Sequence, residues 1–555
     1  MGHRQNYSKF SRTLTEKWIT LPCGLLQKRS SSQLAPDPRI SGSPCNASLS
    51  PALCRQGPAS IDGAMKLVPS QKWIRRLGLG LGLLSINAAA EPDRPNFIVI
   101  FANDLGYGDL GCFGSETIKT PNIDRMAREG LKLTSFYAQT VCGPSRPALL
   151  TGSYPLRVAT SDNKVAVHPH LHSKEITVAE VLHQVGYKSI AIGKWDVAGH
   201  SQKLGGSDPK LYPTQQDFDE FFGTPSSNDR IVNLVRGDQV IETETDMSQL
   251  TRRFTDEAIQ FIKTNTSAGE NGRDPSPFFV YLAHSMPHVE LAVSKAFRGK
   301  SAGGLYGDVV EEIDFNVGRI LQTLEDEGLD ENTTVIFTSD NDPWFFGRSA
   351  GHKKRFGENW AEHGGSAAPL RGAKTSSWEG GLRVPFVIRA PGRIPAGSES
   401  DIVAATIDLM PTLAALAGGE TPTDRIIDGR NISSLLETSN SHQVESKPYF
   451  YYLKTRLAAV RFGKWKLHVP RPIDPQWEKY STMADAAAIA QPALFNLNED
   501  IAETENVAAQ HPKVVAELLK HIHHARTDIA DHDRIGKNAR FFDPGPRRTD
   551  ILAEL

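Results

Sequence analysis

The chain of 555 residues contains few cysteines and carries almost no net charge. Of its five cysteines, three precede residue 65, and only Cys112 and Cys142 lie beyond it. This count excludes a small scaffold held by disulfides. The 62 basic residues are balanced by 64 acidic ones, so no overall basic field indicates a nucleic-acid partner. No cluster of histidine and cysteine has the spacing of a zinc site.

The first 90 residues differ in composition from the rest. Residues 1–64 are rich in serine, proline, glycine and basic residues, which is typical of a disordered leader or of a mis-assigned start. After Met65 come a basic stretch, an apolar run from Leu77 to Ile86, and small residues ending at Ala90. This order predicts a secretory signal peptide over 65–90, whose apolar run is too short for a permanent membrane anchor. We therefore expect an exported protein, periplasmic or secreted, with Met65 as its natural start.

Apolar runs of strand length alternate with helical patterns over residues 91–440. Strands are expected at 96–102, 131–138, 187–193, 278–283, 334–338 and 384–389. Helices are expected at 121–129, 176–185, 249–263, 309–327 and 401–416. The alternation predicts an α/β catalytic domain in which helices cover both faces of a mostly parallel sheet.

The composition changes beyond about residue 440. Short strands separated by turn residues are expected at 449–453, 458–461 and 464–469, and a helix near 512–521. They predict a smaller α+β subdomain over 441–530 that contains a short antiparallel sheet. Residues 531–555 are polar and are expected to form a loose tail.

The stretch 141–152 reads V-C-G-P-S-R-P-A-L-L-T-G. Pro144 suits the first turn of a helix, which would place Cys142 at a helix N-terminus, where free N–H groups favour an anion. Arg146, four residues further on, would lie on the same face. A buried structural cysteine is the alternative interpretation. A bridge between Cys112 and Cys142 is another.

Polar side chains follow the predicted strands at the point where each strand ends. They are Asn103, Asp104, Cys142, Lys194, His288, Asp340 and Asn341, while Lys374 and Arg383 precede the last strand. In open α/β sheets, ligands bind beyond the carboxyl ends of the strands. The separate segments are therefore expected to meet in one cleft.

Several motifs together resemble those of the type I sulfatases, of the arylsulfatase type, over most of 95–521. They are A-N-D-L-G-Y-G-D (102–109), T-P-N-I-D-R-M-A (120–127), C-G-P-S-R (142–146), G-K-W (193–195), P-H (287–288), T-S-D-N (338–341) and P-L-R-G-A-K-T-S-S-W-E-G-G-L-R-V-P (369–385). The resemblance implies an alkaline-phosphatase-like fold. It also implies that a formylglycine-generating enzyme oxidises Cys142 to formylglycine, whose hydrate is the nucleophile.

The resemblance further implies a role for each polar residue. Asn103, Asp104, Asp340 and Asn341, with residue 142, match the ligands of Ca²⁺, and their hard oxygen atoms also suit Mg²⁺. Arg146, Lys194 and Lys374 match the cations that surround the sulfate group. His288 matches the histidine near the leaving group, which donates a proton. Lys194, His288 and Lys374 are thus the expected substrate-binding residues.

The sequence departs from the family pattern at three positions. Asn103 stands where an aspartate is usual, so the metal site has one negative charge fewer. Asp342 stands where a glycine is usual and compensates if its side chain points inward. Asp196 replaces a histidine that helps the hydrate to release sulfate, so either His200 serves instead or Asp196 acts as the base.

The expected function is hydrolysis of sulfuric esters, with a sulfated carbohydrate as the most plausible substrate. One alternative is a phosphate or phosphonate ester hydrolase of the same superfamily. Another is a non-catalytic glycan-binding relative, which the substitutions at Asn103 and Asp196 suggest.

Overall fold

A computed structural model describes residues 94–158, 171–199, 207–228, 232–267, 276–344, 363–436, 444–472 and 487–540. The segments expected to be a leader (1–64) and a signal peptide (65–90) lie outside the described residues, and so does His200. None of the described helices has the length and apolar character that a membrane span requires.

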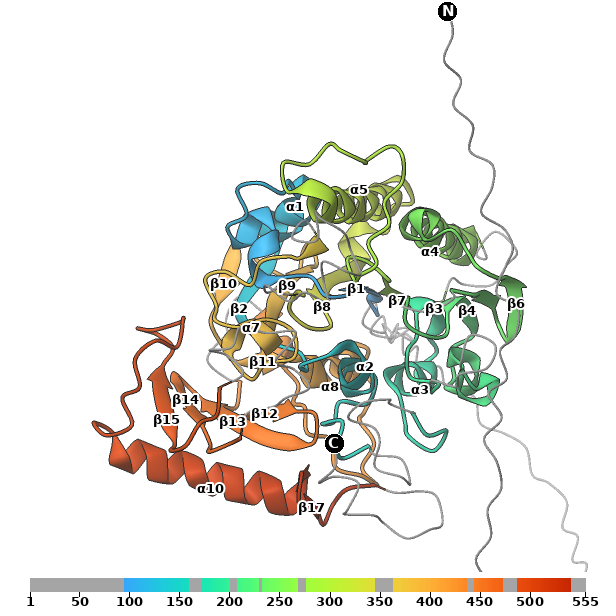
Figure 1. Ribbon diagram of the computed structural model, residues 1–555. Helices are drawn as coiled ribbons and strands as arrows, with labels where there is room; N and C mark the ends of the chain where they lie inside the picture. Colours follow the sequence, from blue (N-terminus) through green and yellow to red (C-terminus); the bar gives the residue numbers. More distant parts are fainter. Residues whose placement is uncertain are drawn as a thin grey trace, which may run out of the picture. The chain divides into compact units, whose positions relative to one another are not determined.

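A large mixed sheet forms the centre of the catalytic part (Figure 1). Its strands are β1 (Asn96–Ala102), β2 (Leu131–Tyr137), β3 (Lys188–Lys194), β4 (Glu220–Thr224), β5 (Leu234–Arg236), β6 (Gln239–Glu242), β7 (Phe278–Ala283), β8 (Thr333–Ser339), β9 (Arg383–Arg389), β10 (Ser398–Ser400) and β11 (Ala404–Ala405). They are ordered β10-β2-β9-β8-β1-β7-β3-β4-β5-β6, and β11 also pairs with β2. Strand β1 is parallel to both neighbours, β7 and β8. The predicted mostly parallel sheet is confirmed.

Side chains on the two faces of the sheet belong to two separate apolar clusters. In β1, Phe97, Val99 and Phe101 face one cluster, and Ile98 and Ile100 face the other. Helices cover both faces, as Figure 1 shows. On one side lie α1 (Pro121–Glu129), α4 (Leu250–Ser267) and α5 (Gly304–Asp326), and on the other α2 (Cys142–Thr151), α3 (Val178–His183) and α8 (Leu409–Leu416). Burial on both faces explains why these strands are continuous apolar runs.

Strand β9 runs against the direction of its neighbours. It pairs antiparallel with β8 and with β2, where Arg383 lies opposite Tyr137. The N-terminal end of β9 therefore lies at the same sheet edge as the carboxyl ends of β1, β2 and β8. This orientation brings the segment that precedes Arg383 to the edge where ligands bind in such sheets.

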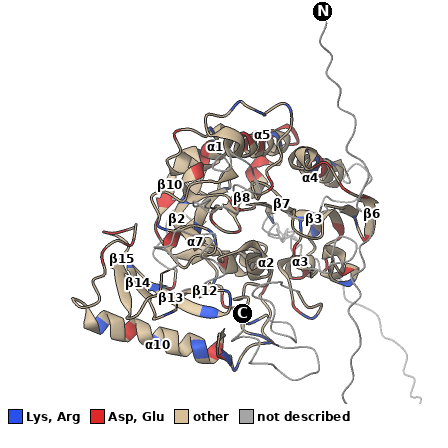
Figure 2. Cartoon of the chain, in the orientation of Figure 1, with Lys and Arg blue, Asp and Glu red and all other residues tan. Residues whose placement is uncertain are grey.

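The C-terminal part contains the expected short antiparallel sheet. Its strands are β12 (Tyr449–Leu453), β13 (Arg456–Phe462), β14 (Trp465–His468) and β15 (Ala493–Asn496), in that order. Helix α10 (Pro512–Asp528) packs on this sheet through Leu518 and Ile522. The same apolar cluster includes Tyr137 of β2 and Leu382, so the C-terminal sheet and the catalytic part share a core. Basic and acidic positions are interspersed along α10, in keeping with the balanced composition (Figure 2).

Two expectations about secondary structure are corrected. The helix expected at 401–416 begins only at Leu409, because Ala404–Ala405 form strand β11 beside β2. Residues 531–540 are not loose, since β16 (Ala530–Asp531) pairs with β17 (Arg534–Ile535). Asp531 is buried and accepts a hydrogen bond from the backbone N–H of Leu457 at 3.0 Å. That contact explains how a polar segment can pack against the subdomain.

Candidate active site

Helix α2 places Cys142 at the carboxyl edge of the sheet. The helix begins at Cys142, as predicted, after an extended Val141, and it ends at Gly152, whose φ of 63° suits glycine. Cys142 is half-buried, and it forms no disulfide with Cys112. Burial raises the pKa of the Cys142 thiol to about 11, although nearby Lys194 and Lys374 oppose the shift. Residue 142 therefore lies at the start of a helix and near two lysines.

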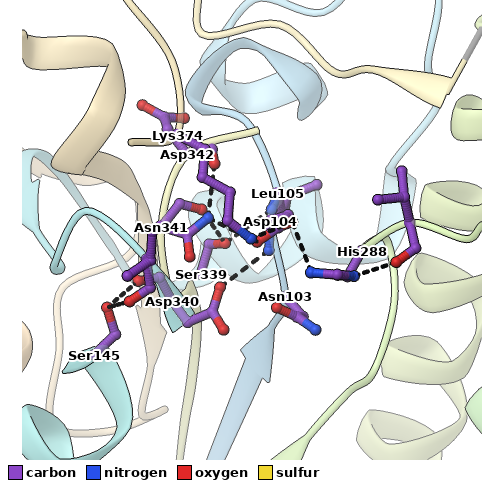
Figure 3. A network of polar contacts seen from close by, with 12 residues as sticks. Asn103, Asp104, Leu105, Ser145, His288, Ser339, Asp340, Asn341, Asp342 and Lys374 are labelled. Atoms are coloured by element: carbon purple, nitrogen blue, oxygen red, sulfur yellow. Dashed lines mark hydrogen bonds and ion pairs between the residues drawn. The ribbon is translucent and has the colours of Figure 1, made fainter. Parts of the chain in front are cut away.

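Asp104 connects most of the other polar side chains, as Figure 3 shows. Its carboxylate accepts hydrogen bonds from Lys374 Nζ at 2.6 and 2.7 Å and from Asn341 Nδ2 at 2.7 Å. His288 Nε2 lies 3.6 Å from the same carboxylate. Asp104 is fully buried and has a φ of 67°, in the left-handed region that aspartate tolerates better than most residues. Three separate segments thus converge on one carboxylate.

Asp340 joins this cluster to helix α2. Its Oδ1 accepts a hydrogen bond from the backbone N–H of Asp104 at 3.0 Å, and its Oδ2 accepts one from Arg146 Nη2 at 2.9 Å. Arg146 also donates to the carbonyl of Lys194 at 2.5 Å. Ser145 donates to the carbonyl of Asp340. Arg146 and Asp340 are both fully buried, so the pair fixes α2 against β8 and β3.

The donor atoms of this cluster fit a hard cation. The Oδ1 atoms of Asn103 and Asn341 are buried without a hydrogen-bond partner among the described residues. Asn103 Nδ2 donates to the carbonyl of Ser285 at 3.0 Å, which directs its oxygen away from that carbonyl. With the carboxylates of Asp104 and Asp340, these atoms form a set of oxygen ligands that suits Ca²⁺ or Mg²⁺.

Asp342 does not join the oxygen cluster. Its Oδ1 accepts a hydrogen bond from the backbone N–H of Tyr107 at 2.6 Å, on the side of Asp109 and Glu379. Burial raises the pKa of Asp342 well above its ordinary value. Asp342 therefore does not replace the charge that is missing at Asn103.

Lys194 and Asp196 form a buried ion pair near Cys142. Lys194 Nζ lies 3.3 Å from Asp196 Oδ2, and both side chains are almost inaccessible. Burial acts to lower the pKa of Lys194, but the charges of Asp196 and Cys142 hold it above its ordinary value. Asp196 adopts a φ of 57° and donates its backbone N–H to the carbonyl of Pro225 at 3.1 Å. An aspartate at this position partly neutralises the lysine beside residue 142.

His288 and Trp344 border the cluster near Lys374. His288 Nδ1 donates to the carbonyl of Val289, which turns Nε2 towards Asp104. The ring of Trp344 lies 6.1 Å from that of His288, and Lys374 Nζ lies 4.7 Å above the tryptophan ring. Sequence reasoning missed Trp344, because it follows the D-N-D segment in a loop whose course no periodicity indicates.

The expected catalytic and metal-binding side chains thus come together at one edge of the sheet. Cys142, Arg146, Lys194, His288 and Lys374 surround the oxygen cluster through the contacts described above. Asp342 is directed elsewhere, and His200 is outside the described residues. The arrangement offers a partly exposed residue at a helix N-terminus, oxygen ligands for a hard cation and three fixed cations. It can bind a tetrahedral anion and stabilise charge that develops on it.

A mostly parallel sheet covered by helices, with this cluster at its edge, defines an alkaline-phosphatase-like hydrolase. The family model described as Sulfatase matches residues 95–419, more than half of the chain. The model for the C-terminal region of aryl-sulfatase matches residues 444–544. The chain belongs to the sulfatase family, and it is a sulfuric ester hydrolase.

Named relatives agree with this assignment. N-acetylgalactosamine-6-sulfatase of Canis lupus familiaris is 35% identical over 420 residues, which cover 71% of this chain and 75% of the relative. Steryl-sulfatase of Rattus norvegicus is 34% identical and covers 71% of this chain and 79% of its own length. A solved structure from work on the metabolism of multiple glycosaminoglycans by Bacteroides thetaiotaomicron superposes with a TM-score of 0.66 at 26% identity. It covers 78% of this chain and 100% of its own.

Proposed function

We propose that this sulfatase removes sulfate from a sulfated carbohydrate, with residue 142 as formylglycine and Ca²⁺ bound by the oxygen cluster. The observation that carries the proposal is the convergence of Cys142, Lys194, Lys374 and Asp104 at one sheet edge. The substrate class is supported by the relatives named for N-acetylgalactosamine-6-sulfate and for glycosaminoglycan metabolism.

The metal would be held by Asp104, Asp340, Asn341 and Asn103, with residue 142 completing the set. When present, formylglycine supplies a hydrated aldehyde oxygen as nucleophile, and the cation polarises it. Asn103 brings a neutral amide, so this chain offers two carboxylate charges to the cation rather than three. The orphaned oxygens of Asn103 and Asn341 support this ligand set.

Three cations of the chain would hold the sulfate group and the charge that moves onto it. Lys194 and Lys374 lie close enough to Cys142 for their charges to act on its thiol. Arg146, fixed by Asp340, stabilises developing negative charge without having to reorganise. A sulfate ester bound among these groups loses its water shell, which strengthens each interaction.

Proton transfers would fall to His288 and Asp196. His288 directs Nε2 towards the cluster, so this atom donates the proton that the departing alcohol needs. Asp196 lies beside Lys194 and would accept a proton in the step that releases sulfate. A carboxylate near a leaving anion is a poorer base than imidazole, so we expect this second step to limit turnover.

Export and maturation complete the proposal. The predicted signal peptide would carry the chain to the periplasm or outside the cell, and a formylglycine-generating enzyme would oxidise Cys142 on the way. Neither nucleic acid nor a permanent membrane anchor is part of the proposal.

Matched substrates test the function. A panel of sulfated monosaccharides, each paired with its phosphate ester, is incubated with the matured protein in Ca²⁺, and the release of sulfate or phosphate is measured. We expect sulfate release, and none from the Cys142→Ala variant. Faster phosphate release would favour the phosphoester alternative. Saccharide binding without turnover, in protein whose residue 142 has matured, would favour the glycan-binding alternative.

A further inference from the structure

The loop that carries Lys374 closes tightly on itself. The backbone N–H of Gly380 donates to the carbonyl of Arg371 at 2.7 Å. A Cβ atom on Gly380 would lie 2.7 Å from the carbonyl of Gly372, so only glycine fits here. Thr375, next to Lys374, has a φ of 74°, and its backbone N–H donates to the carbonyl of Thr140 at 3.0 Å. Residues 371–380 thus form a compact unit whose position decides where Lys374 lies.

Three residues of the C-terminal part contact this unit or support the residue that does. They are Lys466, His468 and Glu503, and we name them the C-terminal clamp. The carboxylate of Glu503 accepts hydrogen bonds from Lys466 Nζ at 2.9 Å, from His468 Nε2 at 2.8 Å and from the backbone N–H of Glu379 at 2.7 Å. Its own carbonyl accepts a hydrogen bond from Arg371 Nη1 at 3.0 Å. Glu503 is therefore bonded to both ends of the loop.

Stacked rings join the clamp to the middle of the loop. The guanidinium carbon of Arg371 lies 3.6 Å from the centre of the Trp378 ring. The ring of His468 also packs on Trp378, and the two ring centroids lie 4.4 Å apart. Burial lowers the pKa of His468 to about 4, so its ring is neutral near pH 7 and stacks without the cost of burying a charge.

Buried charges tie the clamp to the catalytic sheet. Glu379 accepts hydrogen bonds from Lys466 Nζ at 3.0 Å and from Tyr137 of β2 at 2.6 Å, and it pairs with Arg383 of β9 at 3.3 Å. Burial acts to raise the pKa of Glu379, but Lys466, Arg461 and Arg383 hold it below its ordinary value. A buried network with its charges paired is rigid, and breaking one partner is costly.

We infer that the C-terminal clamp positions Lys374 for the reaction, although no residue of the clamp reaches the reacting atoms. The clamp fixes residues 371–379, and this loop in turn holds Lys374 Nζ within 2.6 Å of Asp104 and close to residue 142. The inference rests on the proposed function, because that function gives Lys374 its role in binding sulfate. It assigns the C-terminal sheet a part in catalysis beyond stability.

A double-mutant cycle tests the inference. Glu503→Gln keeps the shape of the side chain and removes its charge, and a displacement of Lys374 by about 1 Å should lower kcat/KM by about 10- to 100-fold. The same substitution should have no further effect in a Lys374→Met background, since the lysine through which it acts is then absent. Affinity for inorganic sulfate, measured by calorimetry, should weaken in Glu503→Gln and provides a readout that needs no turnover.

Asp528→Asn is the matched control. It breaks another ion pair between the C-terminal part and the catalytic part, Asp528 with Arg157 at 2.7 Å, but leaves residues 371–380 untouched. We expect kcat/KM and sulfate affinity to stay unchanged in this variant, even if it unfolds at a lower temperature. A parallel loss of activity in Asp528→Asn and Glu503→Gln would overturn the inference, because it would indicate general destabilisation.

The remaining outcomes separate the inference from the proposed function. If Glu503→Gln lowers kcat/KM equally with and without Lys374, the clamp inference is wrong and the proposed function stands. If Lys374→Met alone leaves kcat/KM unchanged, the proposed role of Lys374 is wrong. If Glu503→Gln does not fold, Arg371→Met replaces it. This variant loses both the hydrogen bond to the Glu503 carbonyl and the guanidinium that lies over Trp378. Its loss of activity should likewise disappear in the Lys374→Met background.

Discussion

Removal of the Lys374 charge should have opposite effects on catalysis and on metal binding. Lys374 Nζ contacts both oxygens of Asp104, at 2.6 and 2.7 Å, and the side chain is only 4% exposed. A sulfate oxygen about 4 Å from such an ammonium gains about 4 kcal/mol at an effective dielectric constant of about 20. Since about 1.4 kcal/mol corresponds to tenfold in rate, Lys374→Met should lower kcat/KM by up to about 10³-fold.

The same substitution releases the carboxylate of Asp104 from its strongest partner. Among the described residues, the Asp104 carboxylate then keeps Asn341 at 2.7 Å and the more distant His288 at 3.6 Å. A carboxylate without a competing ammonium is a better ligand for a hard cation. Titration calorimetry with Ca²⁺ should therefore show tighter binding in Lys374→Met than in the wild type, while sulfate release falls.

The control is Lys513→Met, which removes an exposed lysine from α10 and should change neither quantity. Kinetics on one sulfate ester and calorimetry with Ca²⁺ are compared across the three proteins. A Lys374→Met variant with normal kcat/KM, or with weaker Ca²⁺ binding, would refute the assignment of Lys374 to both the sulfate site and Asp104.

Three further predictions concern single residues. Asn103→Asp restores a carboxylate to the oxygen cluster and should tighten Ca²⁺ binding about tenfold, as calorimetry will measure; unchanged affinity would exclude Asn103 from the ligand set. Asp196→His should raise kcat about tenfold, because a positioned imidazole is a better acid–base group here, and a lower kcat would contradict the proposed deficit. The folded pKa of His468, about 4, lies below the ordinary value of 6.5. The unfolded chain therefore binds more protons between these values, and stability falls as the pH decreases through that range. Over this range His468 should cost the wild-type protein about 3 kcal/mol of unfolding free energy, and urea unfolding should show that His468→Gln does not lose this amount. Identical pH profiles of stability in the two proteins would contradict the buried neutral ring.

Much of the fold follows from local sequence signals. The bounds expected for β1, α1 and β7 agree with the structure, because continuous apolar runs mark buried strands and Pro121 marks a helix start. The position of the site could also be predicted from the sequence, since polar residues directly after such strands meet at one sheet edge. Cys142 at the start of α2 follows from the position of Pro144.

Other features depend on contacts between distant residues. An apolar run that is buried on both faces has no direction, so the antiparallel orientation of β9 could not be derived from its residues. Asp342 follows directly after Asn341, yet a backbone turn directs its carboxylate to Tyr107. Glu503 lies more than 120 residues from Glu379, and an isolated glutamate looks the same in a sequence whether it is solvated or buried.

In the proposed function, residue 142 acts as an oxidised cysteine among fixed cations and a hard metal ion. The most direct measurement is the mass of the tryptic peptide that contains residue 142, taken from a preparation whose sulfate release has been quantified. We expect the mass of an aldehyde or its hydrate, in a fraction of the peptide that rises with the specific activity. An unmodified thiol at position 142 in fully active protein would contradict it.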